Sequence, residues 1–189
     1  IAVFGSSGFI GKNLVKSLQH NNEVQEISLR NPFWKNDIGP KTEVFINLIG
    51  KAHDHKGTAT EQDYHFANVE LTQQTFEIFK RSDAKLYIHI SSLAALEEFE
   101  SSRPLAETDK CNPISLYGKS KREAEKWLLK EYLATNKKLI IIRPPMVHGS
   151  GDKGNLGLLY KIISKGIPYP LAAFNNERSF ISIDNFNFY

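Results

Sequence analysis

The sequence predicts an α/β fold built on a doubly wound parallel sheet. Short segments that are typical of strands, most of them apolar runs, lie at residues 1–4, 24–29, 44–50, 86–90 and 138–143. Segments with a helical spacing of apolar residues separate several of these runs, and strands that alternate with helices form parallel sheets. Pro144 and Pro145 stop the fifth run. We therefore expect a sheet-forming domain over residues 1–145 and the start of a small C-terminal part over residues 146–189.

Length, composition and charge bound the class of protein. The 189 residues suit one domain together with part of another. Hydrophobic residues make up 41% of the chain and charged residues 24%, and the net charge of +3 comes from scattered basic residues, with no footprint for nucleic acid or an anionic membrane. A single cysteine, Cys111, excludes an internal disulfide, and no apolar run reaches membrane-spanning length. We therefore expect a soluble cytoplasmic protein without nucleic-acid or membrane partners.

The first candidate site is a glycine-rich turn between the run at residues 1–4 and a segment of helical spacing. Strand, glycine turn and helix are the context of a dinucleotide-binding fingerprint, although the spacing here is G-x-x-G-x-x-G. Gly5 would permit the tight turn, Gly8 would let backbone amides approach a pyrophosphate, and Gly11 would let the helix pack closely on the strand. The pattern predicts a Rossmann-type domain that binds NAD or NADP. Its expected contacts in the turn are Gly5, Ser7, Gly8, Phe9, Ile10 and Gly11.

Arg30 follows the second apolar run, where an acidic residue commonly binds the adenosine ribose about 20 residues beyond the glycines. A guanidinium suits a 2′-phosphate better than a bare ribose, which favours NADP. The alternative is that Arg30 stacks on the adenine without selecting between the two cofactors. Residues 31–41 show no helical periodicity, so the crossover after Arg30 is expected to be short and irregular.

The carboxyl end of the third run predicts further cofactor contacts, because ligands of open α/β sheets lie beyond this end of the strands. These contacts are Leu48, Ile49, Gly50 and Lys51. Asn68 is also expected to contact the cofactor, near the start of a helix. The apolar face of that helix would carry Phe66, Val69, Leu71, Phe76, Ile78 and Phe79. No metal site is expected at His53-Asp54-His55, because three adjacent loop residues rarely converge on one ion.

Tyr117 and Lys121 are the candidates for catalysis. They lie four residues apart on a predicted helix that runs to about Leu133, so they would share one face. A phenol is a poor base at its ordinary pKa of about 10, and a fixed ammonium beside it favours the phenolate. Ser92 follows the fourth run, where its hydroxyl could bond a substrate oxygen. The alternative is a surface helix with one aromatic residue and solvated lysines.

Residues 93–115 form a long loop between these candidates, and long loops in compact domains are usually functional or mobile. Beyond Pro145, a glycine-rich loop over residues 148–155 precedes a predicted helix over residues 156–165. An alternating strand led by Arg178 is expected over residues 178–184.

With Gly5, Gly8 and Gly11, Ser92, Tyr117 and Lys121 in one α/β pattern, the chain resembles the extended short-chain dehydrogenase/reductases. Among these it is similar to the NAD-dependent epimerase/dehydratase family that acts on nucleotide sugars. Residues 143–151 and 178–184 resemble bacterial UDP-sugar 4-epimerase-like members tied to capsule or O-antigen synthesis. Family members are normally much longer and both ends of the sequence interrupt a pattern, so we expect a larger part of a longer protein.

The resemblance implies roles for individual residues. Tyr117 would take the proton from a sugar hydroxyl as hydride leaves for the nicotinamide. Lys121 would hold the nicotinamide ribose and lower the tyrosine pKa, and Ser92 would bond the reacting oxygen. Arg178 matches the position that contacts the nucleotide diphosphate, and Asn155 is a weaker candidate for the same nucleotide. Family dimers often form through the helix that bears the tyrosine, which predicts a homodimer.

Departures from the family pattern narrow the activity. Sugar 4,6-dehydratases carry an Asp-Glu pair directly after the serine or threonine, where this chain has Leu93 and Ala94, so a dehydratase is not expected. The resemblance favours a UDP-sugar 4-epimerase with a transient 4-keto intermediate. Arg30 weakens the case for tightly held NAD and keeps an NADPH-dependent ketosugar reductase as an alternative. A third alternative is a non-catalytic sensing module, which usually lacks the tyrosine or the lysine.

Overall fold

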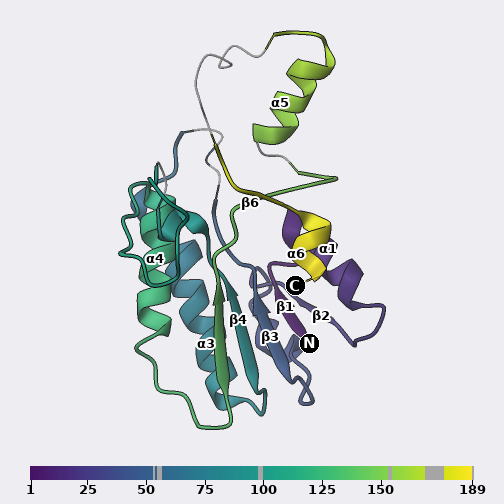
Figure 1. The fold of residues 1–189 in the computed structure, drawn as a ribbon. Helices are drawn as coiled ribbons and strands as arrows, with labels where there is room; N and C mark the ends of the chain where they lie inside the picture. Colours follow the sequence, from purple (N-terminus) through teal and green to yellow (C-terminus); the bar gives the residue numbers. More distant parts are fainter. Residues whose placement is uncertain (53, 55–56, 98–99, 153–154, 169–176, 189) are drawn as a thin grey trace. The chain divides into compact units, whose positions relative to one another are not determined.

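The computed structural model describes residues 1–189 apart from 53, 55–56, 98–99, 153–154, 169–176 and 189 (Figure 1). The chain divides into two compact units, Ile1–Pro144 and Pro145–Tyr189. The first unit contains a five-stranded sheet, and the second contains a pair of short strands with two helices. No helix in the described part of the chain has the length and apolar character needed to cross a membrane.

The sheet of the first unit is parallel throughout, as the sequence predicts. Its spatial order is β2 (Gln25–Ile27), β1 (Ala2–Phe4), β3 (Val44–Asn47), β4 (Leu86–Ile90) and β5 (Lys138–Ile142). The chain leaves β1 towards β2 and continues from β3 in the other direction, so the strand order reverses at β1. Ligands of open α/β sheets bind in the crevice that such a reversal leaves beyond the carboxyl ends of the strands.

Helices cover both faces of this sheet, which confirms the doubly wound α/β fold. On one face, Leu14 and Val15 of α1 (Phe9–Leu18) pack against Val3 and Ile46. On the other face, α3 (Leu71–Arg81) and α4 (Leu116–Leu128) bury a core of aromatic and aliphatic side chains against the strands (Figure 1). The aromatic members of this core include Phe4, Trp34, Phe45, Phe76, Phe79 and Tyr87.

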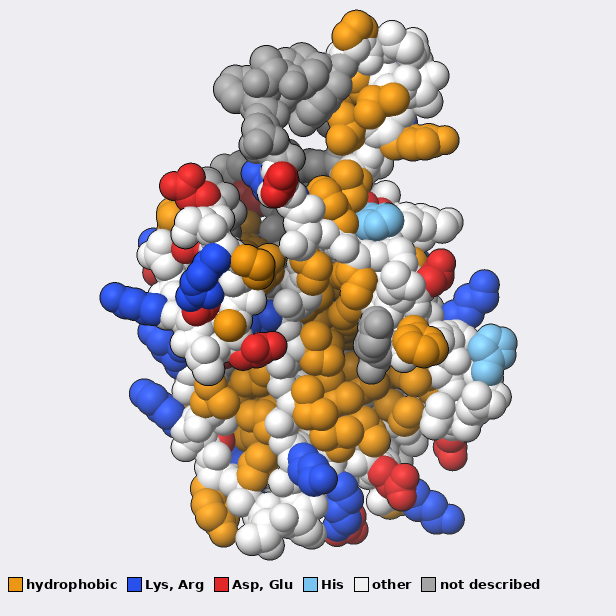
Figure 2. Space-filling model, in the orientation of Figure 1, with side chains coloured by type: hydrophobic (Ala, Val, Ile, Leu, Met, Phe, Trp, Pro, Cys, Tyr) orange, Lys and Arg blue, Asp and Glu red, His pale blue; other side chains and the backbone are white. Residues whose placement is uncertain are grey.

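On the face of the sheet that α1 covers, the strand residues become more exposed from β1 to β5. One residue from each of these strands stands in register in a row across the sheet: Val3, Ile46, Ile88 and Ile140. Val3 is fully buried, whereas Ile140 on the edge strand is 44% exposed. Figure 2 shows apolar side chains gathered on the face seen there. The apolar pattern of the β5 run therefore predicts the strand correctly, although each of its five positions is exposed or half-buried.

The helical segment before β4 differs from the sequence-based expectation. It begins at Glu61, where Thr60 and Asp63 form a reciprocal capping box, and it contains α2 (Glu61–His65), the π turn η2 (Phe66–Glu70) and α3. Asn68 therefore lies in the middle of the segment rather than near its start. Because a π turn inserts an extra residue, it rotates the positions before it relative to those after it. Phe66 is consequently 52% exposed and does not share the apolar face of Phe76.

The helix that carries Tyr117 is shorter than predicted, because α4 ends at Leu128 instead of about Leu133. The backbone tightens there, as Lys130 N–H bonds the carbonyl of Trp127. Leu129 and Tyr132, which follow the end of α4, are exposed. The crossover over residues 31–41 is short, as expected, and contains only the single turn η1 (Trp34–Asp37) among the described elements.

In the second unit, β6 (Met146–His148) pairs in parallel with β7 (Phe180–Ser182), and α5 (Asn155–Ser164) and α6 (Ile183–Phe188) complete it. The prediction of a continuous strand over residues 178–184 is wrong. Ser182 Oγ accepts a hydrogen bond from Asn185 N–H at 3.1 Å, which turns the chain into α6 directly after β7. Gly149 is required after β6, since a Cβ there would lie 2.5 Å from Cγ2 of Ile183.

Candidate active site

The glycine turn joins β1 to α1 at the carboxyl edge of the sheet. Gly5 has φ +85°, and a Cβ at Gly5 would lie 2.9 Å from the carbonyl carbon of Leu48. Gly8 N–H donates to the Gly5 carbonyl at 3.2 Å and closes the turn. A Cβ on Gly11 would lie 2.3 Å from the Gly5 carbonyl oxygen, so glycine is what allows α1 to approach the turn. The spacing G-x-x-G-x-x-G is thus explained by backbone geometry at its first and third positions.

The amino end of α1 is suited to an anion. Gly8 is its N-cap and, among the residues that the structure describes, no side chain caps α1 and no acidic residue lies in its first turn. The first N–H groups of a helix lack intrahelical partners, and the helix dipole favours negative charge there. Ser7 and Gly8 are exposed, while Phe9 and Ile10 are half-buried. The predicted pyrophosphate contacts are therefore placed where a phosphate could reach the backbone.

Arg30 lies at the same edge of the sheet, in the turn that follows β2. β2 is the parallel neighbour of β1, with Phe4 in register with Ile27. The Arg30 side chain is exposed. This position is compatible with the predicted contact to the adenosine part of a dinucleotide, which remains a prediction.

The segment after β3 is held in place by Asn68. Leu48 N–H extends the pairing of β3 with β1 by donating to the Phe4 carbonyl at 2.9 Å. Asn68 is fully buried; its Oδ1 accepts from Lys51 N–H at 2.7 Å, and its Nδ2 donates to Ser120 Oγ at 2.7 Å. The buried amide thus ties the segment containing Leu48, Ile49, Gly50 and Lys51 to α4. In this structure Asn68 positions the backbone, and its predicted contact with the cofactor is untested.

Lys121 lies where the ends of two strands meet α4. Its side chain is 3% exposed, and Nζ donates to the carbonyls of Ile90 at 2.9 Å and Ile49 at 3.3 Å. A Cβ on Gly50 would come within 3.0 Å of Nζ, so Gly50 leaves room for the ammonium. Burial lowers the pKa of Lys121 to about 8, and the negative charge of Glu125 opposes that shift. The Lys121 ammonium is therefore almost fully buried at the edge of the sheet, where two backbone carbonyls fix its position.

Tyr117 and Ser92 lie on neighbouring elements. Tyr117 is half-buried in the first turn of α4, one turn before Lys121, and Ser115 caps the helix by accepting from Gly118 N–H at 3.0 Å. Ser92 follows β4 and begins the single turn η3 (Leu93–Ala95), which packs against α4. Ser92 Oγ accepts from Ala94 N–H at 3.2 Å. The structure therefore brings the elements that carry the predicted triad together.

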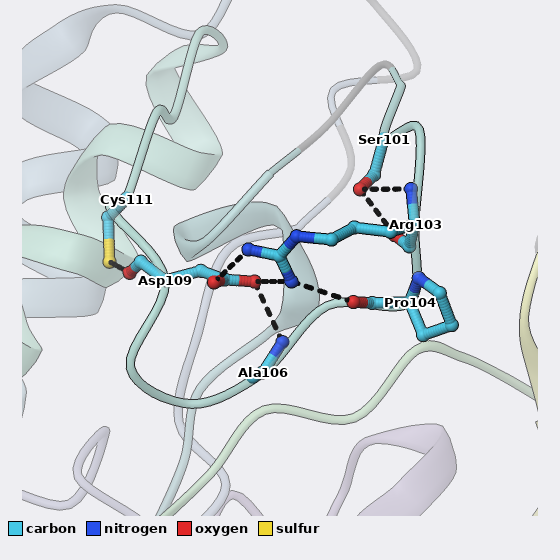
Figure 3. A network of polar contacts seen from close by, with 6 residues as sticks. All are labelled: Ser101, Arg103, Pro104, Ala106, Asp109 and Cys111. Atoms are coloured by element: carbon cyan, nitrogen blue, oxygen red, sulfur yellow. Dashed lines mark hydrogen bonds and ion pairs between the residues drawn. The ribbon is translucent and has the colours of Figure 1, made fainter.

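The loop after Ser92 contains a polar network around Asp109 (Figure 3). Arg103 donates two hydrogen bonds to the Asp109 carboxylate, at 3.1 and 2.6 Å, and Ala106 N–H donates a third at 2.8 Å. The hydrogen bonds from Arg103 and Ala106 hold the pKa of Asp109 below its ordinary value. The Cys111 thiol is 3.9 Å from the Asp109 carbonyl and 3.8 Å from Nη2 of Arg143. This loop therefore contacts the end of β5.

Sequence analysis did not identify the buried carboxylate of Glu125, one turn beyond Lys121. Its two oxygens accept hydrogen bonds from Ser91, Arg122 and Arg143 at 2.6–2.9 Å. Burial alone would raise the pKa of Glu125, but these bonds bring it below its ordinary value. A glutamate in a helix normally indicates a solvated face. Its spacing of four residues from Lys121 and eight from Tyr117 is the signal that could have revealed it.

Asn155 and Arg178 belong to the second unit. Asn155 is the first residue of α5, and Arg178 is exposed in the segment before β7. Their predicted contacts with a nucleotide stay predictions. Among the described residues, no group of three His, Cys, Asp or Glu side chains could hold a metal ion. His53 and His55 of the stretch considered for a metal lie outside the described residues.

The parallel five-stranded sheet and the glycine turn after its first strand form a Rossmann-like fold of the short-chain dehydrogenase/reductase type. The chain belongs to the NAD dependent epimerase/dehydratase family, whose family model matches residues 1–185. This assignment confirms the resemblance drawn from the glycine turn, Tyr117 and Lys121.

Relatives of known activity carry several related chemistries. The chain is 32% identical to a UDP-glucose 4-epimerase of Vibrio cholerae, over 98% of this chain and 63% of the relative. It is 24% identical to an N-acetyl-alpha-D-glucosaminyl-diphospho-ditrans,octacis-undecaprenol 4-epimerase of Escherichia coli O157:H7, over 98% of this chain and 60% of the relative. A ceramide reductase of Caulobacter vibrioides is also 24% identical, over 98% of this chain and 57% of the relative. The chain thus spans about three fifths of the length of these relatives.

Solved structures share the fold. A UDP-glucuronic acid 4-epimerase from Bacillus cereus in complex with UDP-glucuronic acid and NAD superposes with a TM-score of 0.79 at 20% identity, over 98% of this chain and 70% of that chain. A human epimerase family protein with NADPH superposes with a TM-score of 0.80 at 16% identity, over 98% of this chain and 66% of that chain. At these identities the comparison establishes the fold alone. It includes structures with each of the two dinucleotides.

Proposed function

We propose that the full-length protein is an NAD(P)-dependent nucleotide-sugar epimerase, a UDP-sugar 4-epimerase that acts in surface polysaccharide synthesis. The observation that carries this proposal is Lys121, a buried ammonium fixed by the carbonyls of Ile49 and Ile90 in the same helix as Tyr117. Family membership and the two 4-epimerases among the relatives support it. The second unit would form the start of the substrate-binding part.

The residues present fit a dinucleotide. The exposed backbone at Ser7 and Gly8 and the amino end of α1 would hold the pyrophosphate. The segment from Leu48 to Lys51 would lie along the cofactor, and Arg30 would contact its adenosine part. Lys121 would donate to the nicotinamide ribose in addition to the carbonyls that already orient it. The bound cofactor would supply the hydride acceptor for carbon 4 of the sugar.

Tyr117 would be the residue that transfers the proton. Its phenolate would take the proton of the C4 hydroxyl, and the phenol would return it after the 4-keto sugar has turned over. The Lys121 ammonium would favour the phenolate electrostatically, because a positive charge stabilises a neighbouring anion. Ser92 would donate to the reacting oxygen. Arg178, and less strongly Asn155, would bind the nucleotide diphosphate, for which a guanidinium is well shaped.

The alternative function is an NADPH-dependent nucleotide 4-ketosugar reductase with the same three residues. The exposed Arg30 after β2 favours it, since a guanidinium there suits a 2′-phosphate. An epimerase must return the same hydride and therefore keeps its cofactor, whereas a reductase exchanges it. A non-catalytic sensing module is a third option, and the presence of both Tyr117 and Lys121 argues against it.

The cofactor content of purified protein separates these functions. Full-length protein, purified without added nucleotide, is denatured and the released nucleotide is identified and counted. Stoichiometric NAD would support the epimerase, and empty protein that prefers NADPH over NADH would favour the reductase. Failure to bind either dinucleotide would contradict both functions.

Tyr117→Phe should bind the same nucleotide but lose turnover. The matched control is Lys119→Met, on an exposed position of α4.

We also propose a homodimer that forms through α4. Phe66 is 52% exposed on the π turn that packs beside this helix, and Leu116 is exposed at its first residue. Phe66→Glu should convert the dimer to a monomer in size-exclusion chromatography with light scattering. Phe33→Glu, at a phenylalanine that is 69% exposed next to η1, should leave the dimer intact. A monomeric parent protein would refute the dimer.

A further inference from the structure

Glu125 is a charged group without any exposed surface, held between the ends of two strands and a helix. Its Oε1 accepts from Ser91 Oγ at 2.6 Å and from Arg143 Nε at 2.8 Å. Its Oε2 accepts from Arg143 Nη2 at 2.7 Å and from Arg122 Nη1 at 2.9 Å. A buried carboxylate with this many charged and polar donors is costly to disturb, because removing one partner leaves the others uncompensated.

Two of the three residues that donate to Glu125, Ser91 and Arg122, lie on the segments that carry the proposed triad. Ser91 directly precedes Ser92, and Ser91 N–H donates to the Ile142 carbonyl at 2.7 Å, so β4 and β5 end together at this point. Ile90, the residue before Ser91, gives its carbonyl to Lys121. Glu125 itself lies one turn beyond Lys121 on α4. One carboxylate therefore fixes the end of β4 against the helix that holds Tyr117 and Lys121.

We propose that Glu125 is a positioning residue for the proposed reaction: it sets the distance between Ser92 and the Tyr117–Lys121 pair and supplies the counter-charge that keeps Lys121 protonated. This inference depends on the proposed function for its catalytic part. Glu125 makes its hydrogen bonds to Ser91, Arg122 and Arg143, so it acts on the triad through the strand ends and the helix, and on Lys121 through its charge.

The charged groups around Lys121 determine in which direction its pKa would change if Glu125 were neutralised. Glu125 is the acidic group, and Tyr117 lies one turn before Lys121 on the same helix. His89 on β4 is buried, and burial together with the charge of Lys121 keeps its pKa well below the ordinary value, so it is neutral. The cations on the segments packed around Lys121 include Arg122 and Arg143, both bound to Glu125, and Lys51, which follows Gly50 after β3.

Loss of the Glu125 charge would leave the two guanidiniums without a counter-charge near Lys121. The missing negative charge and the two uncompensated positive charges both disfavour the ammonium. The pKa of Lys121 would therefore move below about 8, its value in the presence of Glu125. A neutral amine could no longer favour the Tyr117 phenolate. The high-pH limb of the activity profile should therefore move to lower pH when the charge is removed.

Two substitutions separate charge from geometry. Glu125→Gln keeps the size of the side chain and removes its charge, whereas Glu125→Asp keeps the charge and shortens the reach to Ser91 and Arg143. The matched control is Glu131→Gln, which removes the carboxylate bound to Lys80 at 2.5 Å in the turn after α4. Each variant is made in the full-length protein, and its fraction folded is measured by circular dichroism.

The first readout needs neither cofactor nor substrate. Lysine labelled with ¹³C at Cε reports the titration of Lys121 by NMR in the apoprotein, with Lys121→Arg for assignment. Glu125→Gln should lower the apparent pKa of Lys121 by about one unit, while Glu125→Asp and Glu131→Gln should leave it unchanged. An unchanged titration in Glu125→Gln would overturn the electrostatic part of the proposal, even if the protein turned out to have another function.

The second readout is NADH affinity, by fluorescence, and turnover of UDP-glucose as the probe substrate, both against pH. Glu125→Asp should lower kcat about 100-fold with little change in NADH affinity, because small misplacements of reacting groups are this costly. Wild-type kcat in Glu125→Asp would overturn the positioning role. A parent protein that carries no dinucleotide after purification and also binds no added NADH would instead refute the proposed function, and the Lys121 titration would still decide the role of the Glu125 charge.

Discussion

Gly11 gives a quantitative test of the glycine turn. In Gly11→Ala the new Cβ would lie 2.3 Å from the Gly5 carbonyl oxygen and 2.7 Å from Cα of Ser6. These are backbone atoms that cannot rotate away, so α1 must move off the turn. Overpacking of this kind costs about 3 kcal/mol, and the better helix propensity of alanine returns about 1 kcal/mol. We expect the free energy of unfolding to fall by about 2 kcal/mol.

The matched control is Gly8→Ala. A Cβ on Gly8 would have its nearest contact at 3.4 Å, with the Gly5 carbonyl oxygen, and the φ of Gly8 is −73°, which alanine adopts readily. The loss of unfolding free energy should stay below about 1 kcal/mol. The added methyl group would nevertheless stand at the exposed backbone proposed for the pyrophosphate. Gly8→Ala should therefore weaken NADH binding while leaving the fold intact.

Urea denaturation followed by tryptophan fluorescence measures both variants, since Trp34 and Trp127 both lie in the first unit. Binding is measured on the same samples by NADH fluorescence. The reasoning predicts that Gly11→Ala loses stability and that Gly8→Ala loses mainly affinity. Equal stability of Gly11→Ala and the parent would refute the close approach of α1 to the turn.

Three further predictions concern the framework. Thr60→Ala removes one half of the capping box and should cost about 1 kcal/mol in urea denaturation; an unchanged midpoint would contradict the cap. Phe76→Ala empties the fully buried centre of the aromatic core and should cost about 3–5 kcal/mol, and a loss below 1 kcal/mol would contradict its packing. The folded pKa of Lys121, about 8, lies below the ordinary lysine value of 10.5, so the unfolded chain binds more protons between these pH values. The unfolding free energy of the apoprotein should therefore rise by about 3 kcal/mol across that window relative to Lys121→Met, and parallel pH curves would contradict the burial of the ammonium.

The sheet could be predicted from sequence because its strands are short apolar runs bounded by glycine, serine or proline. The run over residues 86–90 coincides with β4, and the glycine turn lies where its spacing places it. The π turn before α3 could not be predicted, because nothing in the apolar spacing marks an extra backbone residue. That single residue turns Phe66 outward, whereas Asn68 lies in the middle of the helical segment because the segment already begins at Glu61.

The placement of Tyr117 and Lys121 on one helix could be predicted from a short motif, whereas the contacts of Glu125 could not, because they depend on packing. Tyr117 and Lys121 are four residues apart, so any helix would carry them on successive turns. The burial of Glu125 depends on Arg143 and Ser91, which are 18 and 34 residues away in sequence and meet it only in the folded sheet. The turn into α6 after Ser182 was missed for a local reason: alternating residues continue past the point where the serine bonds the first turn of the helix.

Transfer of a label at carbon 4 tests the central claim most directly. Full-length protein is incubated with UDP-glucose, UDP-N-acetylglucosamine or UDP-glucuronic acid that carries deuterium at C4, without added dinucleotide, and the products are followed by NMR. The proposed epimerase should convert one of these sugars to its C4 epimer with the deuterium retained. Absence of any C4 epimer, or an epimer that has lost its deuterium, would contradict it.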